Sequence, residues 1–254
     1  MSGRLTDEVV LVTGAARGIG RAIAAKAAEE GAAVALVDVL ADALDTTTAA
    51  LKQAGATVFA AVGDITDETS VRRAVEQASS ELGPVTVLVN NAGKNAYADA
   101  TRMTVEEWDS VFDVDLKGAW LMARAVLPGM IERRHGSIVN IASIHSSLTT
   151  AGMFPYAAAK SGLVGMTRSL ALDVAPHNVR VNAVSPGFIA TDLLEEFFDT
   201  IPDARAKALD VHPLGRIGTP ENVAEVVCFL ASAAAAFVTG ANWSVDGGLG
   251  VRYA

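Results

Sequence analysis

Three residues in the second half of the chain have the types and spacing needed for proton transfer beside a reactive carbon. Ser143 directly follows the apolar run 138–142, and Tyr156 and Lys160 lie four positions apart just downstream. Residues four apart on a helix share one face, so the phenol and the ammonium are expected side by side. A hydroxyl, a phenol and an ammonium brought together suit the interconversion of an alcohol and a carbonyl.

The chemistry of that reaction explains the residue types. Oxidation of an alcohol by hydride transfer needs a base for the hydroxyl proton, and reduction needs an acid for the carbonyl oxygen. A free tyrosine has a pKa near 10, so it needs a neighbouring positive charge, and an ammonium about 4 Å away supplies roughly the required energy. Lys160 would provide that charge and Ser143 would orient the substrate oxygen. Taken alone, Tyr-x-x-x-Lys is equally typical of a helical surface pair.

A glycine-rich stretch near the start of the chain adds support. The apolar run 9–12 leads into residues 13–20, which contain three glycines. Between a strand and a helix, such glycines allow a tight turn, and the helix presents free N–H groups to a pyrophosphate. The residues predicted to contact a dinucleotide here are Gly14, Arg17, Gly18, Ile19 and Gly20.

The end of the second predicted strand indicates which dinucleotide binds. Asp38 follows Gly20 at the distance where a carboxylate accepts hydrogen bonds from the adenosine ribose hydroxyls. The same charge repels the 2′-phosphate of NADP, by about tenfold in affinity or more. Arg17 opposes this preference, but Val39 adds no second basic group. We therefore expect NAD as the cofactor.

Asp64 and Ile65 follow the third predicted strand and are expected at the adenine. The Asp64 carboxylate is placed to accept a hydrogen bond from the adenine amino group. The alternative is that Asp64 caps the helix that follows Thr66.

Short apolar runs alternate with amphipathic stretches along the sequence, which is the pattern of a doubly wound parallel sheet. We predict one Rossmann-type α/β domain over 1–254, with a seven-stranded parallel sheet and helices on both faces. Strands are predicted at 8–13, 33–38, 57–62, 85–90, 136–142, 179–184 and 241–246.

Helix signals complete this pattern. Gly83-Pro84 ends the helix after Asp64, and Thr104 with Glu107 forms a capping box for a long helix reaching about Arg133. Thr219-Pro220 begins the last helix. The segment 188–216 interrupts the alternation, and we expect a helical lid over the ligand; an ordinary surface insertion is the alternative.

Charge and composition exclude several functions. A formal net charge of −9 repels nucleic acid, and the basic cluster 133–135 fits a helix end. No uncharged run approaches the roughly 20 apolar residues of a membrane span, no leader precedes the first strand, and no grouping has metal-ligand spacing. The single cysteine, Cys228, is expected to be a buried small hydrophobe. We expect a cytoplasmic protein without nucleic-acid, membrane or metal partners.

Taken together, these motifs resemble the short-chain dehydrogenase/reductase family over essentially the whole chain. The matching stretches are 13–20, the turn Asn90-Asn91-Ala92-Gly93, the three catalytic residues, Pro186-Gly187 with Thr191, and 245–248. The resemblance implies a homotetramer whose interface is built from the helices near 105–130 and 155–175. It also implies further cofactor contacts at Asn91, Ala92, Gly93, Tyr156, Lys160, Pro186, Gly187, Ile189 and Thr191.

One position departs from the family pattern. The family's fourth catalytic residue is an Asn within the long helix, and Asp115 stands there. In the family this residue positions a water beside the lysine, largely through its backbone carbonyl. A backbone role would survive the substitution, whereas an ionised Asp115 near Lys160 would weaken that lysine's effect on Tyr156.

Residues around the expected substrate position suggest a polar ligand. Lys94 and Asn95 follow the Asn90–Gly93 turn, and His145 comes two residues after Ser143. Met153 and Phe154 offer an apolar wall. We expect a small sugar, sugar acid or polyol, although a solvated loop lysine and a histidine without a specific role remain alternatives. The other histidines, His135, His177 and His212, are expected in surface or turn positions.

Two other functions compete with this one. A 3-oxoacyl-(acyl-carrier-protein) reductase belongs to the same family, but it would prefer NADPH and a basic docking surface, which Asp38 and the net charge of −9 disfavour. A nucleotide-sensing protein without turnover would typically have lost Tyr156 or Lys160, and both are present.

Overall fold

The predicted strands form one parallel sheet. The computed structural model describes residues 3–200 and 203–252, in which seven strands lie in the order β3-β2-β1-β4-β5-β6-β7. All six pairings are parallel. Each predicted strand is confirmed to within two residues. The bounds are β1 Val9–Thr13, β2 Ala33–Asp38, β3 Val58–Val62, β4 Val87–Asn90, β5 Gly136–Ile141, β6 Val179–Pro186 and β7 Asn242–Val245.

The direction of winding reverses between β1 and β4, which are neighbours in the sheet but not in the chain. At such a switch point the loops after the two strands diverge to opposite faces and leave a crevice at the carboxyl ends. The glycine-rich residues 13–20 follow β1, and the Asn90–Gly93 turn follows β4. The topology therefore brings these two motifs to the same crevice.

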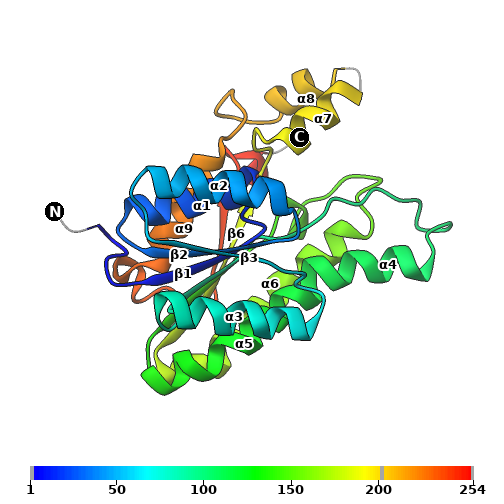
Figure 1. The fold of residues 1–254 in the computed structure, drawn as a ribbon. Helices are drawn as coiled ribbons and strands as arrows, with labels where there is room; N and C mark the ends of the chain where they lie inside the picture. Colours follow the sequence, from blue (N-terminus) through cyan, green and yellow to red (C-terminus); the bar gives the residue numbers. More distant parts are fainter. Residues whose placement is uncertain (1–2, 201–202, 253–254) are drawn as a thin grey trace.

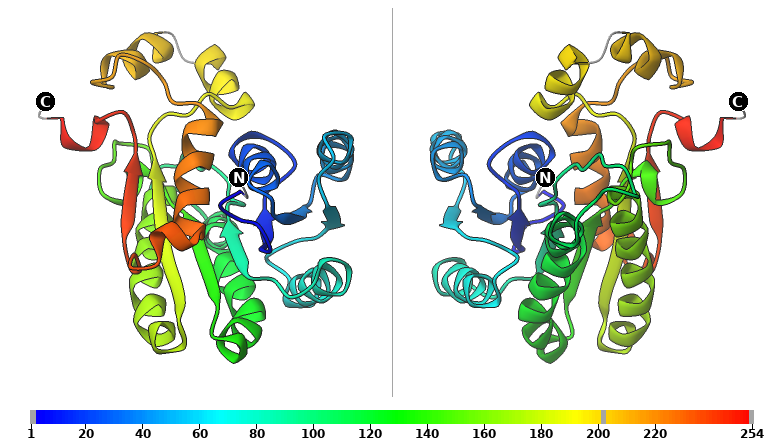
Figure 2. Two further views of the ribbon diagram at one scale, coloured as in Figure 1. Left: turned by 90° about the vertical axis from the view of Figure 1, so that its left-hand side faces the viewer. Right: turned by 90° about the vertical axis from the view of Figure 1, so that its right-hand side faces the viewer.

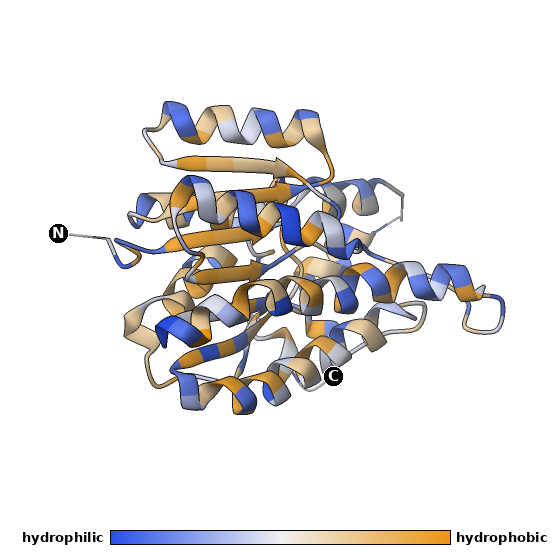
Figure 3. Ribbon diagram, turned by 60° about the horizontal axis from the view of Figure 1, so that its bottom comes forward, coloured by the Kyte–Doolittle hydropathy of each residue, from blue (hydrophilic) through white to orange (hydrophobic). Residues whose placement is uncertain are grey.

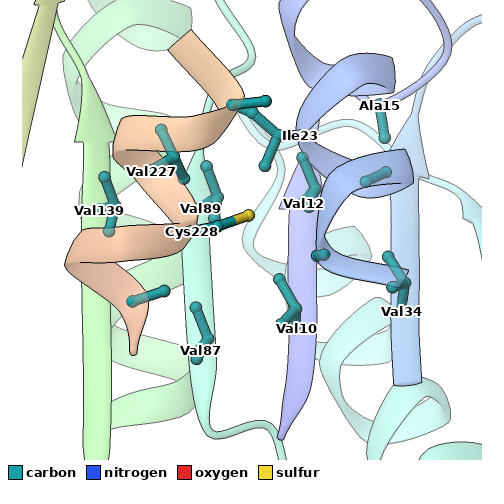
Figure 4. Close-up of a cluster of buried hydrophobic side chains, with 14 of the residues drawn as sticks. Val10, Val12, Ala15, Ile23, Val34, Val87, Val89, Val139, Val227 and Cys228 are labelled. Atoms are coloured by element: carbon teal, nitrogen blue, oxygen red, sulfur yellow. The ribbon is translucent and has the colours of Figure 1, made fainter. Parts of the chain in front are cut away.

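Helices cover both faces of the sheet and bury the apolar strands (Figure 1). On one face, Ile23 of α1 and Val227 and Cys228 of α9 pack over the β1, β2 and β4 valines (Figure 4). Figure 3 shows strands that are largely hydrophobic and helices that alternate in hydropathy, as expected for two-sided burial. The first face carries α1 (Gly18–Glu29), α2 (Ala41–Gln53) and α9 (Pro220–Ala231); the second carries α3 (Glu68–Leu82), α5 (Gly118–Arg133) and α6 (Tyr156–Val174).

Cys228 lies fully inside the first layer, as predicted. Burial raises the pKa of its thiol to about 12. A thiol that stays protonated is a poor nucleophile, so Cys228 acts as a packing residue.

The long helix predicted from Thr104 to about Arg133 is confirmed in its limits and is unbroken, but it is not α-helical throughout. It consists of α4 (Val105–Phe112), a π-helical turn over Asp113–Lys117, and α5. The capping box is confirmed: Thr104 Oγ1 accepts the Glu107 N–H at 3.2 Å, and the Glu107 carboxylate accepts the Thr104 N–H at 2.9 Å. The π turn adds a residue to the helical path and changes which side chains face the sheet. Asp115 lies in this turn.

The residue that caps α3 (Glu68–Leu82) is not Asp64, although helix capping was one of the two roles considered for that residue. The N-cap is Asp67, whose carboxylate accepts the N–H groups of Thr69 at 3.4 Å and Ser70 at 2.8 Å. Asp64 instead closes a short turn, because its Oδ1 accepts both the N–H and the hydroxyl of Thr66 at 2.8 Å. Asp64 is therefore not the helix cap.

A half-buried arginine ties β6 to the end of α9. The Arg180 guanidinium donates to the carbonyls of Leu230 at 2.7 Å, Ala231 at 3.1 Å, Ser232 at 3.1 Å and Val238 at 3.3 Å. Burial lowers the pKa of Arg180. These carbonyls lie at and just beyond the C-terminus of α9, where backbone acceptors lack helical partners and positive charge is favourable.

The segment after β6 forms two helices, α7 (Asp192–Thr200) and α8 (Ala204–Asp210). Figure 2 shows them beyond the carboxyl ends of the strands, apart from the two main helical layers. Phe198, Ala204 and Ala208 form an apolar cluster of their own, against which Phe188, Leu194 and Ile217 pack. None of the described helices is both long enough and apolar enough to cross a bilayer.

Candidate active site

A cavity of about 1320 Å³ opens at the carboxyl ends of the strands. It exceeds the volume typical of sites for a drug-sized ligand, about 300–1,000 Å³, so a dinucleotide and a small substrate both have room. Most of the predicted site residues line it. They are Gly14, Arg17, Gly18, Ile19, Asp38, Asp64, Ile65, Asn91, Ala92, Gly93, Lys94, Asn95, Asp115, Ser143, His145, Met153, Tyr156, Lys160, Pro186, Gly187, Ile189 and Thr191.

The glycine turn has the geometry expected for a phosphate site. Gly14 has φ +63°, and a Cβ there would lie 2.8 Å from the Ala92 Cα. Gly18 has φ +57°, which also favours glycine. The N-cap of α1, Arg17, makes no side-chain capping bond within the described chain, so the first-turn N–H groups are available to an anion. These residues fit a dinucleotide pyrophosphate.

Gly20 has a different role from the one predicted. It is not among the residues described as lining the cavity. A Cβ at Gly20 would lie 2.0 Å from the Gly14 carbonyl oxygen and 2.5 Å from Asn91 Nδ2. Gly20 therefore allows α1 to approach the turn and does not face a ligand.

Asn91 fastens the β4 turn to the glycine turn. Its side-chain amide donates to the carbonyls of Thr13 and Gly14, both at 3.0 Å. Thr13 Oγ1 in return accepts the N–H groups of Asn91 and Ala92 at 3.1 Å. Bonds in both directions fix the relative position of the two loops at the switch point.

Asp38 lies at the end of β2 with 9% of its surface exposed. Its Oδ2 accepts the Ala16 N–H at 2.9 Å and its Oδ1 accepts the Leu40 N–H at 3.0 Å. The carboxylate thus holds the glycine turn while it lines the cavity. The adjacent Val39 and Leu40 are exposed and uncharged.

Ser143, Tyr156 and Lys160 line the same cavity from β5 and α6. Ser143 follows β5, and its Oγ accepts the His145 N–H at 3.2 Å, which leaves its own hydrogen available to a ligand. Lys160 Nζ lies 5.6 Å from the centroid of the Tyr156 ring and donates to the Ile141 carbonyl at 3.1 Å. The cation therefore faces the phenol, as the spacing predicted.

The Asp115 side chain also takes part in this arrangement. Its Oδ1 lies 3.2 Å from Lys160 Nζ and accepts the Lys94 N–H at 3.2 Å. Burial raises the pKa of Asp115, opposed by the Lys160 ammonium. Burial also acts to lower the pKa of Lys160, but the charges of Asp115 and Tyr156 outweigh it, and the pKa is raised. Asp115 thus touches the lysine through its carboxylate.

The loop after β6 forms a further part of the cavity wall and approaches the glycine turn, because a Cβ on Gly18 would lie 3.4 Å from Thr191 Cγ2. Pro186, Gly187, Ile189 and Thr191, which the resemblance assigns to cofactor contacts, line the cavity. His212, expected in a surface or turn position, begins a turn, because its carbonyl accepts the Gly215 N–H at 2.8 Å. Its side chain is not at the surface: it is 3% exposed, and its Nδ1 bonds to a backbone carbonyl in α8.

At the substrate end, four of the five predicted residues line the cavity and one does not. Lys94 Nζ donates to Ser110 Oγ at 2.7 Å, and His145 Nδ1 lies 3.2 Å from Thr149 Oγ1. Burial lowers the pKa of His145. Phe154 is not among the described lining residues; its ring packs against Trp108 of α4 at a centroid distance of 5.3 Å.

Sequence reasoning missed several residues of the cavity wall. Tyr97, Thr149 and Thr150 come from loops, while Lys207 and Arg252 come from α8 and the chain end. Burial raises the pKa of Tyr97. Tyr97 lies two positions after Asn95, so its place in the cavity wall could have been predicted from the sequence. Thr149, Thr150, Lys207 and Arg252 lie in segments without a motif. Among the described residues, no cluster of three or more metal-ligating side chains has the geometry to hold an ion.

Comparisons with known proteins agree with this geometry. Residues 14–250 match the sequence profile of a family described as Enoyl-(Acyl carrier protein) reductase. The chain is 42% identical to the 3-oxoacyl-[acyl-carrier-protein] reductase FabG of Thermotoga maritima, over 97% of this chain and 99% of that protein. It is 40% identical to 2-(S)-hydroxypropyl-CoM dehydrogenase 3 of Xanthobacter autotrophicus, over 98% and 99%.

A solved structure shows the same fold. The crystal structure of a protein provisionally assigned as a gluconate dehydrogenase of Agrobacterium tumefaciens superposes with a TM-score of 0.94, at 31% identity over 98% of each chain. The profile and the relatives cover nearly the whole sequence, including every motif of the cavity. The chain belongs to the short-chain dehydrogenase/reductase family, whose members are nicotinamide-dependent oxidoreductases acting on alcohol and carbonyl groups.

Proposed function

We propose that this protein transfers a hydride between NAD(H) and a secondary or anomeric hydroxyl, or the matching carbonyl, of a sugar, sugar acid or polyol. The observation that carries the chemistry is that Ser143, Tyr156 and Lys160 line one cavity with the glycine turn. Hydride transfer needs an acid/base group within reach of the cofactor, and this arrangement supplies one.

Asp38 supports NAD over NADP. Its two oxygens each accept one backbone N–H, and a carboxylate oxygen has a further lone pair for a ribose hydroxyl. A 2′-phosphate at the same place would meet a buried negative charge. Arg17 is the opposing cation in the cavity wall, while Val39 and Leu40 add no charge.

Tyr156 exchanges the proton in this proposal. In oxidation, its oxygen takes the hydroxyl proton while the C–H bond of the carbinol carbon breaks and its electron pair leaves as hydride, so that a carbonyl forms; reduction is the reverse. The glycine turn and Thr191 would hold the nicotinamide cofactor, which would supply the hydride acceptor in oxidation and the hydride donor in reduction. Ser143 donates a hydrogen bond to the substrate oxygen, and Lys160 keeps a positive charge beside the phenol.

The substrate class rests on the polar groups at the far end of the cavity. Lys94, Asn95 and His145 line it together with Thr149 and Thr150. His145 is half-buried and the other four residues are exposed, so a bound ligand would cover them. A polar group covered without a partner costs about 1–3 kcal/mol, and such a wall therefore favours ligands with many hydroxyls or a carboxylate over plain hydrocarbon chains. The name of the gluconate dehydrogenase fits this class.

The helical segment 188–216 is proposed to cover the bound substrate. Phe188 and Leu194 line the cavity next to Lys207 of α8, so α7 and α8 can exclude water from the reacting atoms. The cytoplasmic location and the homotetramer remain predictions from composition and resemblance.

A 3-oxoacyl-(acyl-carrier-protein) reductase is the second candidate. The 42% identity to FabG of Thermotoga maritima supports it at least as well as the cavity supports a sugar. Against it stand Asp38, which disfavours NADPH, and the net charge of −9, which disfavours docking of an acidic carrier. The relative named for 2-(S)-hydroxypropyl-CoM also leaves room for a smaller secondary alcohol.

One set of initial-rate measurements separates these candidates. The purified protein is assayed with NAD and with NADP against sugars, sugar acids, polyols and simple secondary alcohols, and with NADH and NADPH against a 3-oxoacyl thioester. The proposal expects the highest kcat/KM for a polyhydroxylated compound with NAD. A higher kcat/KM for the thioester with NADPH would reject the sugar proposal and favour the second candidate.

A further inference from the structure

The ion pair between Asp115 and Lys160 is buried inside the active site. The Nζ–Oδ1 distance is 3.2 Å, and the side chains are 5% exposed for Lys160 and 0% for Asp115. The family pattern has an uncharged amide at position 115, so the carboxylate adds a full negative charge beside the catalytic lysine. At such burial neither charge is screened by solvent.

The surroundings hold both partners in place. Lys160 also donates to the Ile141 carbonyl at 3.1 Å, and Asp115 Oδ1 also accepts the Lys94 N–H at 3.2 Å. Asp115 sits in the π-helical turn, which directs it toward α6. Its Oδ2 is buried without a hydrogen-bond partner among the described residues, so the ion pair is the main compensation for its charge.

Few other charges act on the phenol. The titratable groups near Tyr156 and Lys160 are Asp115, Lys94, Tyr97 and His145. Burial lowers the pKa of His145 and raises that of Tyr97, so both favour their neutral forms. Burial also raises the pKa of Asp115, but the Lys160 ammonium 3.2 Å away opposes this shift and stabilises the carboxylate. Asp115 is therefore the anionic partner of the lysine within this described group.

We propose that the Asp115 carboxylate is a positioning residue that anchors Lys160 and partly neutralises it, and so sets the pH range in which Tyr156 exchanges protons with the substrate. The inference rests on the proposed function, in which Tyr156 is the acid/base group. A phenolate gains less from an ammonium that already has a counter-ion. Alcohol oxidation should therefore begin at higher pH than it would with an amide at this position.

The test is the pH dependence of kcat/KM for oxidation in Asp115→Asn. A unit charge about 10 Å away, at an effective dielectric near 20, moves a titration by about one pH unit. We expect the acidic limb to move down by at least about half a unit, with the maximal rate within about tenfold of wild type. NADH binding, followed by fluorescence, checks that the variant is folded.

Asp113→Asn is the matched control. Asp113 lies in the same π turn, but it is 41% exposed and pairs with Lys117 at 2.9 Å, so its removal changes the charge of the turn without touching Lys160. Its acidic limb should stay in place. If Asp115→Asn does not fold, Asp115→Ser removes the same charge with a smaller side chain and must give the same downward shift.

The outcomes are separable. An active Asp115→Asn enzyme whose acidic limb is unmoved, or moves up, overturns the inference and leaves the proposed function intact. A wild-type protein that oxidises none of the candidate alcohols, or a Tyr156→Phe variant with full activity, overturns the proposed function instead.

Discussion

Replacing Asp38 by asparagine should change both cofactor choice and stability, because its carboxylate has two tasks. In the wild type each oxygen accepts a backbone N–H, from Ala16 at 2.9 Å and from Leu40 at 3.0 Å. An asparagine keeps one acceptor and turns an NH₂ group toward the other donor. One hydrogen bond to a charged group is lost and one N–H is left unpaired, which costs about 1–3 kcal/mol. At roughly 2–4 °C per kcal/mol for a chain of this size, the Tm should fall by about 2–12 °C.

The effect on the cofactor follows from charge. The repulsion between a carboxylate and a phosphate about 4 Å apart, at an effective dielectric near 20, is about 4 kcal/mol per unit charge. Even a third of that energy corresponds to about a tenfold loss of affinity for NADP. The ratio of kcat/KM for NAD over NADP should be at least about tenfold in the wild type. It should fall by about tenfold or more in Asp38→Asn, and reverse in Asp38→Arg.

The exposed Asp42, in the first turn of α2, provides the control, since Asp42→Asn removes one charge nearby without a buried bond. Its cofactor ratio and Tm should match the wild type. Steady-state kinetics and thermal unfolding suffice for both variants. A folded Asp38→Asn enzyme with an unchanged NAD/NADP ratio would refute the reasoning, as would equal use of both cofactors by the wild type.

Four further results are expected. Tyr156→Phe should bind NADH by fluorescence yet lose about 10²-fold or more in turnover, whereas Lys160→Ala should lose turnover and cofactor affinity together; near-normal kcat in the first contradicts the proton-transfer role. Lys94→Ala and His145→Ala should raise KM for the polar substrate without changing NAD binding, and two silent variants would remove both residues from the site. Arg180→Met should lower the free energy of unfolding by about 1–3 kcal/mol, because four carbonyls lose a half-buried donor, and an unchanged denaturation midpoint speaks against that anchor. Light scattering should give four times the mass of one chain, and a monomer would show that the resemblance misled on assembly.

The sequence predicted the parts of this structure that follow from local patterns. Buried parallel strands are runs of apolar residues, so all seven could be located, and glycines needed for φ > 0 at Gly14 and Gly18 identified the phosphate turn. Tyr156 and Lys160 could be paired because helical spacing alone brings them to one face.

Features that depend on contacts across the fold could not be predicted in this way. Gly14 and Gly20 belong to the same motif but need to be glycine for different reasons. Gly14 needs the positive φ, whereas Gly20 needs to lack a side chain because α1 packs against the turn. The motif alone does not distinguish these two reasons. Phe154 precedes Tyr156 but packs on Trp108 of α4, a contact between segments far apart in the chain. The burial of His212 and the approach of Asp115 to Lys160 depend on how elements far apart in the chain pack together. Residue type and spacing do not predict such packing.

The separate apolar cluster of α7 and α8 has a consequence for how this scaffold can diversify. Phe198, Ala204 and Ala208 pack within their own segment, whereas the two main cores between sheet and helices are formed by other residues. Changes in this segment therefore leave the folding of the sheet, the cofactor turn and the acid/base residues largely untouched. Exchange of this self-packed segment can thus change the substrate while the sheet and the glycine turn stay the same. This fits the different names of two similar proteins, an acyl-carrier-protein reductase and a protein provisionally assigned as a gluconate dehydrogenase.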